Sequence, residues 1–160
     1  MNPRDTSQEV RISDERIISE AVALVNEGLS VTLMVKGRSM LPFILGGRDS
    51  VVLVKPEVIS PCDVVLARIG GRRYVLHRVL EATPQEVVLM GDGNIRGTET
   101  CPPEEVLAKA VEVVKPDGRR VSLTSPAHLR RARTWRRLLP LRRWILAVYK
   151  RTIIRNIEIQ

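Results

Sequence analysis

The chain has 160 residues, of which 44% are apolar and 28% charged, a composition that is typical of one globular domain and excludes general disorder. Its net charge of +8 is concentrated at one end. Residues 118–160 carry 12 Lys and Arg against one acid, a balance of +11, whereas residues 1–117 carry 14 basic and 17 acidic residues, a balance of −3. The total charge therefore describes a basic tail on a mildly acidic body, and gives the body no nucleic-acid-binding character.

The only cysteines are Cys62 and Cys101, and the only histidines are His77 and His128. Their spacings do not match zinc, iron–sulfur or redox-pair motifs. The two cysteines can either form one disulfide or remain as two buried thiols. The N-terminus lacks the apolar core of a signal peptide, and no stretch approaches 18 uninterrupted apolar residues. We therefore expect no transmembrane helix, no His-rich metal site, and a cytoplasmic, reducing location.

The first expected element is a helix over about residues 14–27. Residues 1–12 are interpreted as a loose leader, with Ser13 as the N-cap. Asp14 and Glu15 then lie in the first turn, where the helix dipole favours acids, and Gly28 ends the helix. Residues 1–29 thus form a leader and one amphipathic helix.

After residue 29 the hydrophobic period changes from 3.6 to 2, and short apolar runs alternate with Gly and Pro. Gly70-Gly71 has the composition of a two-residue hairpin turn, and a further turn is expected at 116–118. Residues 30–124 are therefore predicted to form a mainly β domain, a twisted antiparallel structure. Its expected strands are 31–35, 50–55, 63–69, 73–81, 86–90 and 106–114.

Residues 125–160 are predicted to form a basic, amphipathic helical tail, with Ser125 as its N-cap and a break at Pro140. The first piece places Ala132, Trp135, Leu138 and Leu139 opposite Arg130, Arg133, Arg136 and Arg137. The second places Leu141, Trp144, Ile145, Val148 and Tyr149 opposite Arg142, Arg143, Lys150 and Arg151. Residues 126–155 have the composition of a segment that binds an anionic membrane surface, which would place the protein peripherally on the inner face of the membrane. Packing of this basic segment on the body or on a partner protein is equally open, and nonspecific nucleic-acid binding ranks third.

Ser39 lies in the run V-K-G-R-S-M-L-P-F-I of residues 35–44, where an expected strand enters a turn. A serine beside free backbone N–H groups has the ingredients of a nucleophile with an oxyanion site. The simpler interpretation is a turn residue that satisfies the backbone. The residues alone favour this simpler interpretation.

His77 and Asp92 are the other candidates. His77 lies in an apolar strand, where a hydrogen-bonded core histidine is more common than a base, although a half-buried imidazole suits a general base. His128 is a weaker candidate. Asp92 lies in G-D-G-N, directly after a strand, where it either completes a turn or orients the histidine.

Four short motifs follow one another along the body. They are S-M-x-P at Ser39, Met40 and Pro42, D-V-V at 63–65, H-R-V at 77–79 and G-D-x-N at 91–94. In this order they resemble the boxes of type I signal peptidases and their self-cleaving repressor relatives, over about residues 30–114. The histidine in the base box is similar to the Ser-His branch of that superfamily. The runs SMLPFILGGRDSVVL and LMGDGNIRGTE resemble small members, encoded in Bacteroides-type bacteria, that lack a transmembrane anchor.

This resemblance implies a role for each motif residue. Ser39 is the expected nucleophile and its N–H an oxyanion donor, with His77 as general base and Asp92 as orienting acid. The implied substrate is a peptide or protein segment that adds as an extended strand, and the chemistry needs no metal or cofactor. The chain departs from the family in having an amphipathic helix in place of the membrane anchor, and Cys62 where glycine is usual.

The resulting hypothesis is a serine endopeptidase of signal-peptidase-like type, a peptide-bond hydrolase with a Ser-His dyad. Two alternatives remain. One is a catalytically silent peptide-binding module in peptide maturation or export. The other is a self-cleaving regulator, although residues 1–29 are too short for the helix-turn-helix domain of the repressors and position 77 lacks their lysine.

Overall fold

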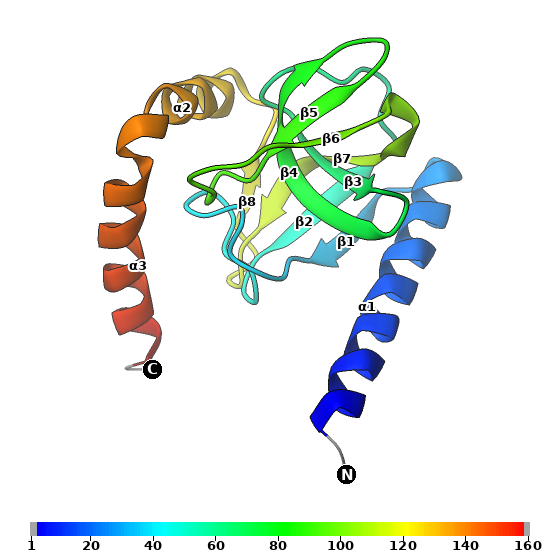
Figure 1. Cartoon of the computed structure of the whole chain (residues 1–160), viewed down its shortest axis with the longest axis horizontal. Helices are drawn as coiled ribbons and strands as arrows, with labels where there is room; N and C mark the ends of the chain where they lie inside the picture. Colours follow the sequence, from blue (N-terminus) through cyan, green and yellow to red (C-terminus); the bar gives the residue numbers. More distant parts are fainter. Residues whose placement is uncertain (1–2, 159–160) are drawn as a thin grey trace.

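A computed structural model describes the fold of residues 3–158 and the side chains of 14–153, 155 and 156 (Figure 1). It contains one β sheet, three α-helices and two short 3₁₀ segments. The helices are α1 (Pro3–Asn26), η1 (Pro103–Glu105), α2 (Pro126–Arg137), η2 (Leu139–Leu141) and α3 (Arg142–Glu158). The strands are β1 (Val31–Met34), β2 (Ser50–Val54), β3 (Val64–Ile69), β4 (Arg73–Ala82), β5 (Val87–Met90), β6 (Glu99–Cys101), β7 (Val106–Val114) and β8 (Arg120–Ser122).

The eight strands form one antiparallel sheet in the order β1-β2-β7-β3-β4-β5-β6, with β8 paired to β7. Register shifts interrupt the β2–β7, β3–β7 and β4–β5 ladders. Because irregularities of this kind increase local twist, the sheet curls into a half-barrel. The prediction of a mainly β, antiparallel domain is confirmed.

All six expected strands are present, within two residues of their predicted ends. Gly70 and Gly71 both have positive φ and close the β3–β4 hairpin, as their composition predicted. The sequence did not indicate β6 and β8, which have three residues each. Segments that short cannot show the alternation that identifies a strand, and their pairing with β5 and β7 is set by the fold.

The sheet buries apolar side chains on both faces, as a curled sheet requires. One cluster lies under α1 and the loop that follows β1; its members include Val25, Val35, Met40, Ile44, Val51, Leu53, Leu66 and Val113. The other lies between β3, β4, β5 and β7; its members include Val65, Ala67, Val75, Val79, Val87, Leu89 and Val106. Both cysteines are buried and unpaired, so the two-thiol alternative holds.

The first helix begins earlier than predicted. α1 starts at Pro3, so the loose leader is wrong over residues 3–12, as is the N-cap at Ser13, whereas residues 1 and 2 lie outside the described residues; the helix over 14–26 is confirmed. Proline is well suited to the first turn of a helix, because its missing N–H has no partner there. Among the α1 side chains that the structure describes, from residue 14 on, Ala21 and Val25 are buried, and Val25 belongs to the cluster under the helix.

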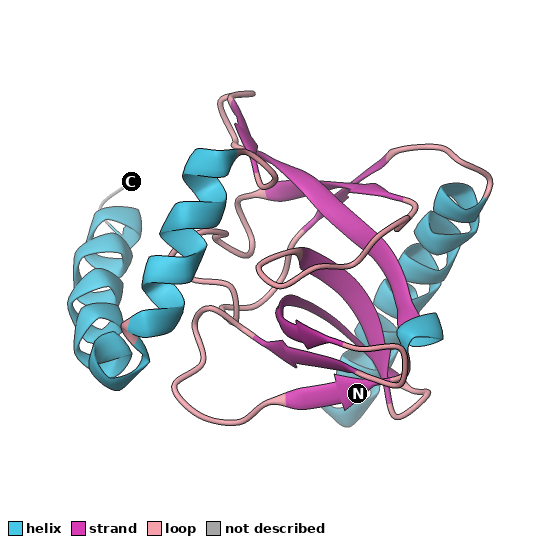
Figure 2. Ribbon diagram, turned by 90° about the horizontal axis from the view of Figure 1, so that it is seen from above, coloured by secondary structure: helices cyan, strands magenta, loops and turns pink. Residues whose placement is uncertain are grey.

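The tail starts as predicted. Ser125 caps α2, since its Oγ accepts a hydrogen bond from the backbone N–H of His128, 3.2 Å away. Ala132 and Trp135 face inward, and Pro140 lies in η2 between the two helices. The tail packs on the opposite side of the sheet from α1 (Figure 2).

The predicted faces of α3 are partly wrong. Arg142, expected on the solvent side, is buried together with Leu146, and Tyr149 is half-buried beside them. The other apolar residues that were predicted to share a face with Tyr149 are exposed instead: Leu141, Trp144, Ile145 and Val148. The reason is that Arg142 finds carbonyl partners inside the fold, described below. Within the described residues, every helix is too short or too polar to cross a lipid bilayer.

Candidate functional site

Ser39 lies in a closed loop that leaves and re-enters the sheet at neighbouring points. The N–H of Val35 donates to the carbonyl of Asp49 (3.0 Å), and the N–H of Gly47 donates to the carbonyl of Val35 (2.7 Å). Met40 and Ile44 anchor the loop in the core. The loop, which contains a cis peptide bond before Pro42, thus holds a half-buried Ser39 on a fixed backbone.

The G-D-G-N loop packs directly on the backbone around Ser39. The N–H of Gly93 donates to the carbonyl of Ser39, 2.7 Å away. A Cβ atom on Gly91 would lie 2.4 Å from the Ser39 oxygen, and one on Gly93 would lie 2.4 Å from the oxygen of Arg38. Neither glycine has positive φ, so both are needed for close approach rather than for the tight bend that the sequence suggested.

Asp92 forms a buried, bidentate ion pair with Arg78 of β4. Arg78 Nε donates to Asp92 Oδ1 (2.8 Å), and Nη2 donates to Oδ2 (2.7 Å). The two side chains are only 4% and 3% exposed. Asp92 was expected to orient His77, but its carboxylate is held by Arg78.

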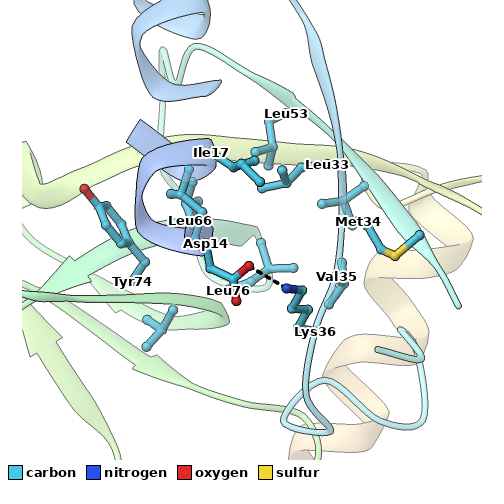
Figure 3. Close-up of a pocket in the computed structure, with 13 residues that line it drawn as sticks. Asp14, Ile17, Leu33, Met34, Val35, Lys36, Leu53, Leu66, Tyr74 and Leu76 are labelled. Carbon is cyan, nitrogen blue, oxygen red and sulfur yellow. Dashed lines mark hydrogen bonds and ion pairs between the residues drawn. The ribbon is translucent and has the colours of Figure 1, made fainter. Parts of the chain in front are cut away.

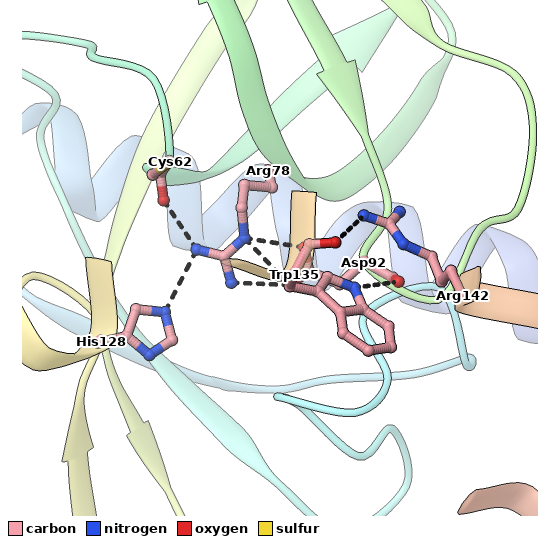
Figure 4. A network of polar contacts seen from close by, with 6 residues as sticks. All are labelled: Cys62, Arg78, Asp92, His128, Trp135 and Arg142. Carbon is pink, nitrogen blue, oxygen red and sulfur yellow. Dashed lines mark hydrogen bonds and ion pairs between the residues drawn. The ribbon is translucent and has the colours of Figure 1, made fainter. Parts of the chain in front are cut away.

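Arg78 joins three further parts of the chain, of which Figure 4 shows Cys62 and His128. Its Nη1 donates to the carbonyl of Cys62 (2.8 Å) and lies 3.2 Å from Nε2 of His128 on α2, and its guanidinium stacks on the ring of Phe43. Burial and the neighbouring Arg78 charge lower the pKa of His128 to about 4. His128 is therefore neutral near pH 7 and accepts from Arg78, which gives it a structural role.

Cys62 adopts positive φ (75°), the backbone region that favours glycine. Its N–H donates to Val79 (2.8 Å) and its carbonyl accepts from Arg78, so both neighbours hold it in this conformation. Cys62 thus has a backbone conformation in which glycine is the more usual residue.

The tail is part of this site. Trp135 Nε1 donates to the backbone carbonyl of Asp92 (2.8 Å). Arg142 Nη1 donates to the carbonyl of Asn94 (3.0 Å), Nη2 donates to that of Trp135 (3.3 Å), and the guanidinium stacks on the indole. α2 and α3 therefore fix the backbone of the G-D-G-N loop, a function that the sequence did not reveal.

His77 contacts a different carboxylate, that of Glu99. Its Nδ1 lies 3.2 Å from Glu99 Oε2, and the His77 side chain is 7% exposed. This is the distance of an ion pair; within the described residues neither atom has a hydrogen-bond partner, although both atoms are buried. The register explains the contact, because Leu89 of β5 pairs with Val79 on one side and Glu99 on the other, which places Glu99 on the face of His77. Glu99 also pairs with Arg73.

Burial lowers the pKa of His77 below its ordinary value, and the nearby Arg73 charge lowers it further, whereas Glu99 and Asp92 partly oppose both. His77 is therefore neutral near pH 7. Neutral imidazole is the form that a general base requires, with the proton on the nitrogen that faces Glu99.

The structure brings Ser39 against the loop of Asp92, and His77 against Glu99. Within the described residues, no hydrogen bond joins the side chains of Ser39, His77 and Asp92 to one another. Sequence reasoning missed Glu99, which lies in a three-residue strand outside the quoted motifs. The resemblance indicated one acid after the histidine, Asp92. Only the sheet register shows that the carboxylate facing His77 is that of Glu99 instead.

A mainly apolar cavity of about 290 Å³ lies between the edge strand β1 and β4 (Figure 3). Leu33, Val51, Leu53, Leu66 and Leu76 contribute to its lining. α1 borders it, and Lys36 at its rim pairs with Asp14 of α1 at 2.5 Å. β1 runs from this cavity towards Ser39, and Leu76 precedes His77.

In the described part of the chain, no group of three or more His, Cys, Asp or Glu side chains is arranged to hold a metal ion. Comparison of the sequence with protein-family models gives no match, and comparison with curated proteins gives none.

Gly91→Ala is expected to destabilise the protein by about 3 kcal/mol or more, because the added methyl group meets a backbone oxygen that cannot move freely. Gly118→Ala, at a positive-φ site with open space, is the control and should cost about 1 kcal/mol. Urea unfolding measures both. Equal losses for the two variants would contradict the close approach of the loops.

The folded protein should lose stability as pH falls from about 6.5 towards about 4. In this range His128 is protonated in the unfolded chain but stays neutral in the folded protein, because its pKa is lowered there to about 4. His128 alone contributes about 2 kcal/mol between about pH 7.5 and about pH 5. Urea unfolding at the two pH values should show a smaller difference in His128→Gln. Some pH dependence should remain, since the pKa of His77 is also lowered. An undiminished difference in the variant would refute this role of His128.

Proposed function

We propose that the protein is a serine endopeptidase in which Ser39 is the nucleophile, His77 the general base and Glu99 the acid that orients His77. The contact between His77 Nδ1 and Glu99 Oε2 carries the proposal. A buried histidine beside a carboxylate whose nearer oxygen is buried holds its Nδ1 proton towards the acid, which leaves Nε2 as the basic nitrogen. Among the described contacts, His77 Nε2 has no hydrogen-bond partner.

Two features support an approach of Ser39 to His77. The β4–β5 register pairs Val79 with Leu89 and Arg78 with Met90, and its extension by one residue sets Gly91 opposite His77. Opposed residues of an antiparallel pair project to the same face of a sheet. A Cβ atom on Gly91 would point at the Ser39 carbonyl, so, with the register continued one residue past the end of β5, we place the Ser39 backbone over the face that His77 occupies.

The proposed reaction is acyl transfer to serine and then to water. Ser39 Oγ attacks the substrate carbonyl carbon while its proton passes to His77 Nε2, and the resulting oxyanion accepts a hydrogen bond from the Ser39 N–H. Collapse breaks the peptide bond, and the leaving amine takes the proton from His77. A water molecule then hydrolyses the ester by the same proton route. Neither Ser39 Oγ nor its N–H has a partner among the described hydrogen bonds.

The proposed substrate is an extended peptide that lies beside β1 with apolar side chains in the cavity. β1 is an edge strand, so its free backbone groups suit the addition of a strand. The strand ends at Met34, five residues before Ser39, so a peptide that continues along β1 approaches the Ser39 loop. Lys36 and Asp14 are the charged groups among the lining residues, so we expect a preference for apolar side chains on that part of the substrate.

Asp92 is a positioning residue in this proposal. Its pair with Arg78 fixes the loop on which the Ser39 carbonyl rests. Its coulombic effect on His77 is secondary to that of Glu99.

Ser39→Ala and His77→Ala should each remove cleavage of a proteome-derived peptide library, read by mass spectrometry, and Glu99→Gln should lower it strongly but leave measurable activity, with the folded state intact in all three. Loss of the nucleophile or base should lower the rate by about 10³-fold or more. Asp92→Asn should instead lower stability by about 3 kcal/mol, because it leaves Arg78 buried without its counter-charge. Ser30→Ala, at an exposed serine, is the control.

A wild-type protein that binds library peptides but neither cleaves them nor becomes labelled at Ser39 by a serine-acylating probe would contradict the peptidase. That result would establish the peptide-binding alternative. If Glu99→Gln cleaves normally while a folded Asp92→Asn variant does not, the orienting acid is Asp92.

The acid limb of kcat/KM against pH should lie below the ordinary histidine value of 6.5, because His77 must be unprotonated and burial lowers its pKa. Glu99→Gln should move the limb to lower pH, since the carboxylate raises that pKa, and Arg73→Gln should move it to higher pH. Residual activity of the variants on a cleaved library peptide measures both shifts. Identical limbs in the two variants would show that another group titrates.

A further inference from the structure

α3 has two apolar faces, and only one of them is covered by the fold. Arg142, Leu146 and Tyr149 face the sheet and the Ser39 loop. The other face forms a stripe, which we call the outer stripe, at spacings of three and four residues. Its members are Trp144 (62% exposed), Ile145 (36%) and Val148 (65%) of α3, together with Leu141 (54%) at the end of η2.

The outer stripe lies among cations. Arg143 stacks its guanidinium on the Trp144 ring, with 4.7 Å between the guanidinium carbon and the ring centroid. Arg151 and Arg155 are exposed on the next turns of α3. Further exposed arginines lie on the adjoining helix α2: Arg130, Arg131, Arg133, Arg136 and Arg137. From residue 118 to the end of the chain, the sequence contains one acid, Glu158.

We propose that the outer stripe docks on the surface of an anionic lipid bilayer, with α3 parallel to the membrane plane. Exposed Trp, Leu, Ile and Val on one side of a helix bury into the boundary between headgroups and acyl chains. The arginines then lie at the depth of the lipid phosphates, where each adds attraction to a negatively charged surface. This inference is independent of the proposed peptidase activity.

Other occupants fit only one half of the surface. A nucleic acid would be attracted to the arginines but would leave Leu141, Ile145 and Val148 in water. A second copy docked stripe to stripe would cover the apolar side chains but would bring two tails of +11 charge together. A bilayer with anionic lipid satisfies both the apolar and the cationic groups of α3.

The test uses the full chain and vesicles of phosphatidylcholine, with or without about one third phosphatidylglycerol. Co-sedimentation should show binding to the anionic vesicles, at least tenfold weaker binding to neutral ones, and release at high salt. The emission of exposed Trp144 should shift to shorter wavelength on binding. Trp135 is already buried, so Trp144→Phe should abolish the shift.

Paired variants separate the two contributions. Val148→Ser should weaken vesicle binding by about fivefold, whereas Val58→Ser, at a site that is 70% exposed on the body, should leave it unchanged. Arg155→Gln should weaken it by about fivefold, and Lys55→Gln, at an exposed body site, should not.

Three results would overturn the proposal: no binding to anionic vesicles, equal binding to neutral and anionic vesicles, or equal effects of the tail and body variants. Self-association that Val148→Ser abolishes, without vesicle binding, would assign the stripe to a second copy and refute the membrane. Circular dichroism of each variant shows that α3 remains helical, so a loss of binding reports on the stripe and not on unfolding.

Discussion

The buried ion pair between Arg78 and Asp92 is the interaction on which the rest of the structure depends. A buried guanidinium is tolerated only when its donors have partners, and Arg78 has a carboxylate, a carbonyl and a neutral imidazole. These partners belong to the G-D-G-N loop, the segment before β3, and α2. Removal of one member of such a pair typically costs about 3–5 kcal/mol, because the other charge remains buried. One side chain of β4 therefore holds together three segments that are far apart in the sequence.

The same pair explains why the two acids near His77 have different partners. The carboxylate of Asp92 is occupied by Arg78 and is nearly inaccessible, so it has little capacity left for the histidine. Glu99 pairs through one oxygen with Arg73, which is largely exposed, and its other oxygen, Oε2, lies near Nδ1 of His77. Burial alone would make His77 a weak base, and the Glu99 carboxylate raises its pKa again. The short strand β6 matters because it places that carboxylate on the correct face.

Most of the fold was predictable because its strands are regular and its turns contain glycine or proline. The effects of Gly70-Gly71, Ser125 and Pro140 depend only on their neighbours in the sequence. They form a hairpin turn, a helix N-cap and a helix break, as their chemistry predicts. The errors concern interactions between distant segments. Gly91 is needed because of the Ser39 carbonyl, Glu99 acts through the sheet register, and Arg142 is buried because Asn94 and Trp135 present carbonyls to it. No local pattern contains those partners, so the sequence identified Ser39, His77 and Asp92 as candidates but not how they are connected.

The basic tail illustrates how one type of residue is divided between two functions. Arg142 is buried and donates a hydrogen bond to the G-D-G-N loop, whereas Arg143, the next residue, is exposed and stacks on Trp144. Because opposite sides of one helix serve the two purposes, any surface bound by the outer stripe lies about one helix diameter, roughly 10 Å, from the loop that supports Ser39. Docking through α3 would therefore fix the orientation of the candidate site relative to the bound surface. A peptide attached to that surface would reach the site at a high effective concentration, without any contact that increases affinity for the peptide itself.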